Sequence, residues 1–248
     1  DGGFKREMLR CNERTAKIFY ECPDNTIHSV GGEKGKYSTR LKFPQPSPNL
    51  NVRWCSSYLK IDVCAAAIRN QERFNGLRTL VLSGERGEES KQRAGYAILE
   101  PDKSDLRHGK KIVRYVDRYR PIRDWTERRI WDLLEKYRVK PHPCYFMGFG
   151  RCSCKFCIFG NANQFASAAC ISHQNFSQLV KFEKEFGYTL KRDTDLSTLI
   201  KKGVPYRDIT PELARLATSY QYNSDIFIPY TQQWELPAGA FKKCGGPM

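Results

Sequence analysis

Apolar side chains follow two kinds of pattern along this chain. Two short, mostly apolar segments, at 77–82 and 112–116, predict strands, and the first is predicted to be buried. Apolar residues at helical spacing predict four helices, over 57–74, 126–138, 175–186 and 211–222. The order helix, apolar strand and glycine-containing polar loop is typical of an α/β fold.

The helix boundaries have local signals. Ser56 or Ser57 can cap the helix over 57–74, and Thr210 precedes Pro211 at a first helical position. Four residues of the helix over 126–138 are expected to point into the core: Ile130, Trp131, Leu134 and Tyr137. Before residue 53 there is no long periodic segment. The glycines of 31–35 indicate a turn between short strands there.

Composition narrows the class of protein. Of the 248 residues, 40% are hydrophobic and 12% aromatic, which supports a packed core and excludes wholesale disorder. The sequence has no signal peptide and no apolar run long enough to cross a membrane, so we expect a cytoplasmic protein without a membrane partner. It opens on Asp1-Gly2-Gly3 without a Met, which predicts a piece of a longer chain.

The net charge of +15 is concentrated in one segment. Residues 103–140 hold 13 Lys and Arg against 6 Asp and Glu. Such a field attracts polyanions, meaning nucleic acid or phosphorylated small molecules, although it also suits an ordinary basic surface. DNA or RNA is therefore one predicted partner.

Cysteines are the clearest candidate for chemistry. Ten of them in a chain without a secretion signal favour metal or redox chemistry over a disulfide framework. Cys154 and Cys157 form a C-x-x-C clamp, Cys152 lies just before it, and Cys144 precedes it across a glycine-containing loop. Zinc and an iron–sulfur cluster both accept such ligands. His142, between two prolines beside Cys144, is either a further ligand or an exposed loop histidine.

Two groups of residues suit phosphate or sulfate. The predicted strand over 77–82 runs into a polar loop with Arg86, Ser90 and Arg93, at the strand end where α/β sheets bind ligands. Arg53 and Lys60 bracket Cys55 at a predicted helix start, where the local field favours thiolate. A solvated turn and a buried structural Cys55 are the alternatives.

Four motifs then occur in a telling order. They are Arg-Trp-Cys-x-x-x-Leu-Lys at 53–60, Gly-Glu-Arg-x-x-Glu-Ser-x-x-Arg-Ala at 84–94, Pro-Ile-x-x-Trp at 121–125 and Arg-x-x-Cys-x-x-Cys at 151–157. Together they resemble the phosphoadenosine phosphosulfate (PAPS) reductase family of the adenine nucleotide alpha-hydrolase-like superfamily. The resemblance spans about residues 50–160.

The resemblance implies a Rossmann-like parallel sheet flanked by helices, with PAPS or ATP as the adenine nucleotide. It also implies reduction of an activated sulfate or nucleotide-dependent sulfur transfer. Carried over by position, Arg86, Ser90 and Arg93 hold the phosphate or sulfate end. Cys55, Cys154 and Cys157 fall on ligand positions of a 4Fe-4S cluster, but Ser56 replaces a further ligand.

The spacing Cys144-x9-Cys154-x2-Cys157 also resembles the cluster region of DNA phosphorothioation sulfurtransferases, which favours nucleic acid as the sulfur acceptor. The expected ligand core is therefore Cys144, Cys154 and Cys157. Its fourth ligand is Cys55, Cys152 or Cys170. Zinc is the alternative metal.

Two family features are absent. The Ser-Gly-Gly-x-Asp-Ser nucleotide loop does not occur, so we expect the N-terminal part of the fold to lie before this sequence. The Glu-Cys-Gly-x-His tail is also missing, which favours sulfur transfer over classical PAPS reduction. The expected organisation is an α/β domain at 1–165, including a Cys-rich loop at 139–165, and a helical extension at 166–248. A zinc-stapled nucleic-acid-binding protein and a non-catalytic subunit are the alternative functions.

Overall fold

The computed structural model describes residues 8–12, 15–21, 27–29, 42–57, 61–219 and 225–242. Its internal contacts divide the chain into two compact units. The first comprises Asp1–Gly87 with Gln92–Arg123, and the second comprises Glu88–Lys91 with Asp124–Met248. The division expected at residue 165 stays a prediction.

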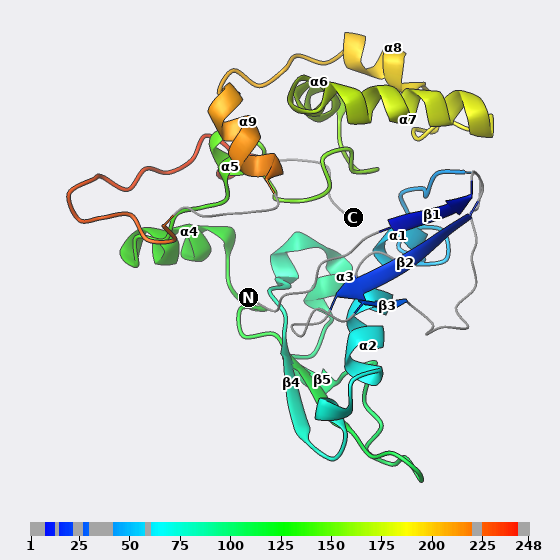
Figure 1. Ribbon diagram of the computed structural model, residues 1–248. Coiled ribbons are helices and arrows are strands. Elements are labelled where there is room, and N and C mark those ends of the chain that lie inside the picture. The colour runs from blue at the N-terminus through cyan, green and yellow to red at the C-terminus, as the bar shows by residue number, and fades with distance from the viewer. Residues whose placement is uncertain are drawn as a thin grey trace. The chain divides into compact units, whose positions relative to one another are not determined.

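The first unit contains two three-stranded sheets (Figure 1). One is an antiparallel sheet of β1 (Met8–Asn12), β2 (Thr15–Glu21) and β3 (Ile27–Ser29), in that order. The sequence pattern indicated only short strands near residues 31–35, and that turn lies outside the described residues. The sheet itself was not predicted.

The second sheet is mixed and has the order β4-β6-β5. It consists of β4 (Arg78–Leu82), β5 (Leu99–Pro101) and β6 (Tyr115–Tyr119). β4 runs parallel to β6, with Arg78 opposite Tyr115 and Leu82 opposite Tyr119, while β5 runs antiparallel to β6. The predicted α/β class with a parallel strand pair is confirmed.

The boundaries of these strands were predicted unequally. β4 agrees with the segment 77–82 in its position but not in its predicted burial, since Leu80 and Leu82 are 56% and 66% exposed. β6 begins at Tyr115 rather than at Ile112. Ile112 is half exposed, and Val113 accepts a hydrogen bond from the Gly76 amide in the loop before the strand pairing starts. The apolar segment 112–116 therefore covers the loop before β6 and only the first two residues of the strand.

The helix predicted over 57–74 is divided into shorter elements. These are α1 (Trp54–Ser56), α2 (Asp62–Arg69) and the 3-10 turn η2 (Glu72–Phe74). Gln71 has an extended backbone, and its side-chain amide donates to the Ala67 carbonyl at 2.8 Å, which ends α2. Val116 in β6 is fully buried. Four small or branched residues of α2 are also buried, namely Ala65, Ala66, Ala67 and Ile68.

Two short elements follow β4, namely η3 (Gly87–Glu89) and α3 (Lys91–Ala94). The longer helices lie in the second unit. They are α4 (Glu127–Lys136), α5 (Pro143–Phe146), α6 (Ala162–Ile171), α7 (His173–Phe186), α8 (Leu196–Lys201) and α9 (Pro211–Thr218). The predicted helical C-terminal region is thereby confirmed. Within the described residues, no helix has the length and apolar character needed to cross a membrane.

The start signal of α9 works as predicted, and α4 begins one residue after the predicted start at Thr126, which is its N-cap. The Thr126 hydroxyl accepts from the Arg129 amide, and the Thr210 hydroxyl accepts from the Leu213 amide, both at 3.2 Å. Trp131 of α4 is buried, but Tyr137 is 57% exposed, so its expected inward position is wrong. Tyr137 lies one residue beyond the last helical turn, where the helix period no longer sets its direction.

Helices α6, α7 and α8 pack together in the second unit (Figure 1). The sequence pattern missed α6, whose start is a capping box between Asn161 and Gln164. Helix α6 buries Phe165 and three alanines, which gives no polar face for a periodicity to detect. The buried Glu183 carboxylate accepts from the Leu190 and Leu196 amides at 2.9 Å and ties α7 to the start of α8.

Candidate metal centre

A cavity of about 70 Å³ in the second unit is surrounded by the Cys-rich loop. Helices α6 and α9 complete its wall with Gln164, Ala217 and Thr218. Its volume is several times the 10–15 Å³ or so that a single water needs, so the cavity can admit a metal ion or a small cluster. Its sulfur and nitrogen donors are His142, Cys144, Cys152, Cys154 and Cys157.

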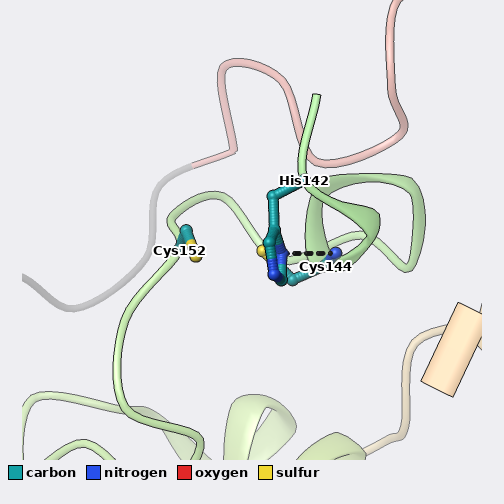
Figure 2. A group of neighbouring side chains, drawn as sticks. All are labelled: His142, Cys144 and Cys152. Atoms are coloured by element: carbon teal, nitrogen blue, oxygen red, sulfur yellow. Dashed lines mark hydrogen bonds between the residues drawn. The ribbon is translucent and has the colours of Figure 1, made fainter. Parts of the chain in front are cut away.

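Three of these side chains form a tight group (Figure 2). One nitrogen of His142 and the sulfurs of Cys144 and Cys152 all lie within 4.8 Å of one another. His142 and Cys144 come from the start of α5, whereas Cys152 comes from the loop that returns past it. Two separate stretches of backbone therefore bring soft donor atoms to one point.

The start of α5 fixes His142 and Cys144. Pro143 occupies the first helical position, and both Pro141 and Pro143 are buried, which anchors the backbone on either side of His142. The Nδ1 atom of His142 accepts the Cys144 amide at 3.2 Å. Because of this bond, the imidazole points back over the first turn toward the cysteine.

The loop after α5 returns toward this group through a glycine. Gly148 has φ of +93°, a conformation that side chains rarely adopt, so the chain can reverse there. The Cys152 amide then donates to the Tyr145 hydroxyl at 3.2 Å. The Tyr145 ring meets the buried Trp131 of α4 edge-on, with ring centres 5.3 Å apart. Through Tyr145, the backbone of Cys152 is thus connected to the buried Trp131 of α4.

The C-x-x-C turn has its own supports. Phe156 packs between Phe165 of α6 and Phe176 of α7, with ring centres 5.9 and 6.0 Å apart. The Lys191 ammonium donates to the Ile158 carbonyl at 2.6 Å and also to the Gly160 carbonyl. These contacts hold the backbone directly after Cys157, so the turn is part of the packed unit.

Burial shifts the pKa values of several titratable groups around the cavity. The thiol of Cys144 donates to Cys152 and is partly buried, and both effects raise the pKa of Cys144. Partial burial lowers the pKa of His142, which favours the neutral imidazole that binds metals. Burial also lowers the pKa of Lys191, despite the opposing field of Cys157.

The predicted ligands are not all placed alike. Cys144, Cys152, Cys154 and Cys157 line the same cavity, as the dense spacing suggested. Cys170 is exposed on α6 and is not part of the cavity wall. Cys55 lies on α1 in the first unit, and its role stays a prediction.

The donor set fits a thiophilic metal. Thiolates and imidazole suit zinc and iron–sulfur chemistry, while carboxylate and water sites suit Mg²⁺ or Ca²⁺. Around the cavity the described donors are four cysteines and one histidine, without a carboxylate. The residues therefore fit the cluster or zinc ion that the sequence predicted.

The expected phosphate-binding residues lie where the sequence put them along the chain. Arg53 directly precedes α1, Arg86 follows the end of β4, and Arg93 is on α3. All three are half-buried, and Ser90 falls between η3 and α3. Lys60 lies outside the described residues. Their phosphate role stays a prediction.

Part of the charge of the basic segment is paired within the fold, and its predicted nucleic-acid role stays a prediction. Arg120 is 5% exposed and donates to Glu85 and Glu100, both at 2.7 Å, and to the Ala97 carbonyl. Arg118 pairs with the buried Asp102 at 2.5 Å. Each of these arginines joins β6 to a neighbouring segment of the first unit, so their charge is used within the fold.

Comparison with known proteins identifies the family. The phosphoadenosine phosphosulfate reductase domain matches residues 23–159, which include the cysteines of the cavity. The chain is also 26% identical over 141 residues to an uncharacterized 37.8 kDa protein of Escherichia phage 186. That alignment covers 55% of this chain but only 39% of the phage protein. No solved structure matches the chain significantly.

Proposed function

The chain belongs to the phosphoadenosine phosphosulfate reductase domain family, and from this premise we propose that it binds PAPS or ATP and reduces or transfers sulfur. The observation that carries the proposal is the position of the cavity. Four cysteines line one cavity inside the segment that the family matches.

The proposed redox group is an iron–sulfur cluster of the 4Fe-4S type, held by Cys144, Cys154 and Cys157 with a fourth ligand from the same wall. When bound, such a group would supply one-electron redox chemistry to the sulfur reaction. The chain's own residues would orient it. Phe156 and Lys191 fix the C-x-x-C turn, and Tyr145 fixes Cys152.

The proposed nucleotide anchors are Arg53, Arg86 and Arg93, with Ser90 as a neutral donor. Guanidinium groups bind phosphate and sulfate through paired charge-assisted hydrogen bonds. Arg86 follows the carboxyl end of β4, the strand that runs parallel to β6, and ligands of α/β sheets bind at that end.

Nucleic acid is the proposed sulfur acceptor, and the exposed lysines of the basic segment support it. Lys110 and Lys111 are exposed in the loop between β5 and β6, whereas Arg118 and Arg120 have partners within the fold. A charge reversal intended to test nucleic-acid binding belongs at the two lysines. Reversal at Arg120 would break the fold and prove nothing about binding.

Calorimetric titration of anaerobically purified protein with PAPS, adenylyl sulfate and ATP tests the nucleotide proposal. We expect one of the three to bind and the double variant Arg86→Gln/Arg93→Gln to lose at least tenfold in affinity. Arg128→Gln, on the exposed face of α4, is the matched control and should bind like the parent. No affinity of the parent protein for any of the three would refute the nucleotide proposal.

A further inference from the structure

The fourth ligand of the cavity was expected to be a cysteine, and a histidine lies closer to the point where the donors meet. In the part of the chain that the structure describes, His142, Cys144 and Cys152 are the group of possible ligands that lie within reach of one ion. Cys55 belongs to the first unit, and Cys170 is outside the cavity wall. This inference rests on the metal centre of the proposed function and concerns its single-ion form, because Cys144 cannot bind a cluster and a separate ion at once.

We propose that His142 is a metal ligand, and that it binds one thiophilic metal ion together with Cys144 and Cys152. The centre would thus have mixed histidine and cysteine ligands. Its metal would be a single zinc or iron ion, because such an ion accepts two thiolates and an imidazole, whereas each iron of a 4Fe-4S cluster bonds three inorganic sulfides and takes only one protein ligand.

The spacing of the three donor atoms supports this assignment. Tetrahedral coordination with metal–sulfur bonds of about 2.3 Å and metal–nitrogen bonds of about 2.0 Å puts ligand atoms roughly 3.5–3.8 Å apart. The present separations are all within 4.8 Å, so each side chain needs a movement of about 1 Å or less to close on one ion. Rotation about the side-chain bonds supplies such a movement.

The environment of His142 also suits a ligand. Its hydrogen bond with the Cys144 amide is 3.2 Å long, toward the weak end for an N–H donor, so its replacement by a metal bond costs little. The flanking prolines hold the backbone whichever nitrogen binds. The ring is exposed on one side, which leaves an entry path for the ion.

Coordination would also explain why two thiols face each other here. Cys144 and Cys152 are close enough to share a hydrogen bond, and two thiolates so close would repel without a cation between them. A structural cysteine pair without a metal would gain nothing from an imidazole as third neighbour. The three together have the donor types of a zinc or iron site.

The variant His142→Asn separates coordination from structure. Asparagine is a strong N-cap, so it keeps a side-chain acceptor for the Cys144 amide while it removes the imidazole. His173→Asn, at the exposed start of α7, is the matched control. Anaerobic titration of the metal-free protein with Co²⁺ reads out the ligand set, because the visible spectrum of tetrahedral Co²⁺ depends on its sulfur and nitrogen donors.

For His142→Asn we expect a Co²⁺ affinity at least tenfold weaker and an altered visible spectrum, with both properties unchanged in His173→Asn. Zinc at one equivalent per chain in the parent protein would support the single-ion site, whereas iron with acid-labile sulfide would assign Cys144 to a cluster and overturn it. Equal affinity and spectrum in His142→Asn and the parent would overturn the histidine assignment alone. Failure of the parent to bind any metal would overturn the metal centre itself.

Discussion

The arginines around β6 and the thiols around α5 differ in what the fold does with them. Arg118 and Arg120 are engaged by carboxylates and carbonyls of the first unit. Around the cavity of the second unit, sulfur atoms meet at a point where packing alone does not require them. A functional group that the fold does not itself use is the better candidate for chemistry.

The comparison also shows what a charge count along the sequence leaves out. The segment 103–140 was counted as strongly basic, but three partners of its arginines lie outside it: Glu85 after β4, Glu100 in β5 and Asp102 directly after β5. Sheet pairing brings these carboxylates to β6 from earlier in the chain. A linear window cannot include partners that are neighbours only in space.

The largest effect is expected from Arg120→Met, which leaves Glu85 and Glu100 without their shared guanidinium. Removal of one member of a buried ion pair costs about 3–5 kcal/mol. Because both carboxylates here are partly exposed, we expect a loss of about 2–3 kcal/mol in the free energy of unfolding. Urea unfolding monitored by circular dichroism measures it.

The control for Arg120→Met is Arg128→Met. Arg128 pairs with Asp132 on the surface of α4, where its side chain is 75% exposed, so the variant should change stability by less than about 1 kcal/mol. Equal losses of unfolding free energy in the two variants would mean that Arg120 is no more structural than a surface arginine. The contrast between the arginines around β6 and the thiols around α5 would then fail.

A smaller effect is expected at the support of the C-x-x-C turn. Lys191→Met leaves the Ile158 and Gly160 carbonyls without their ammonium donor, which should cost about 1–2 kcal/mol of stability. Metal affinity should fall at the same time, because the backbone after Cys157 is released. Lys181→Met, exposed on α7, should change neither property. Unchanged stability and metal affinity in Lys191→Met would show that the turn does not depend on this contact.

Acid should weaken the first unit through Asp105. Its hydrogen bond with Arg107 lowers the pKa of Asp105 to about 2, below the roughly 3.9 of an unfolded chain. The stabilising contribution is therefore complete above about pH 4 and is lost as pH falls toward 2. Urea midpoints at pH 5 and pH 2.5 should differ less in Asp105→Asn than in the parent. An equal pH dependence would exclude Asp105 as a cause.

The smallest effect on stability is expected from the thiols. Cys154 is exposed, so Cys154→Ala in the metal-free protein should change the unfolding free energy by less than about 0.5 kcal/mol. Cys170→Ala provides an equally exposed control away from the cavity. Only Cys154→Ala should reduce metal content. A large loss of stability in the metal-free Cys154→Ala protein would make this thiol a packing residue.

Much of the fold could be predicted where a local signal decides the structure. The position of strand β4, the cap at Thr210 and the helix α7 follow from apolar spacing and a capping residue. The antiparallel sheet of β1, β2 and β3 was not predicted, because its strands of three to seven residues are too short to give a clear periodic signal. Helix α6 was missed because its buried residues are mostly alanines with Gln164 and Ser167 among them, so apolar and polar residues do not fall on separate faces.

The spacing predicted cysteines that lie in one region but not their geometry. Cys144, Cys152, Cys154 and Cys157 line one cavity, since a short loop limits how far they can separate, and Cys144 and Cys152 are the two that lie within 4.8 Å of the His142 ring nitrogen. Their role as ligands stays a prediction. His142 was underrated because a loop histidine gives no spacing signal. Its N-cap position on α5, which the two prolines impose, could have indicated that its ring turns toward Cys144.

Metal and acid-labile sulfide analysis of anaerobically purified protein tests the central claim most directly. The account predicts a bound metal in the parent protein, either iron with sulfide for a cluster or zinc alone for the single-ion site. It predicts loss of that metal in the double variant Cys144→Ala/Cys157→Ala, while Cys170→Ala retains it. Parent protein without metal, or metal retained after both cavity cysteines are removed, would contradict a metal centre in this cavity.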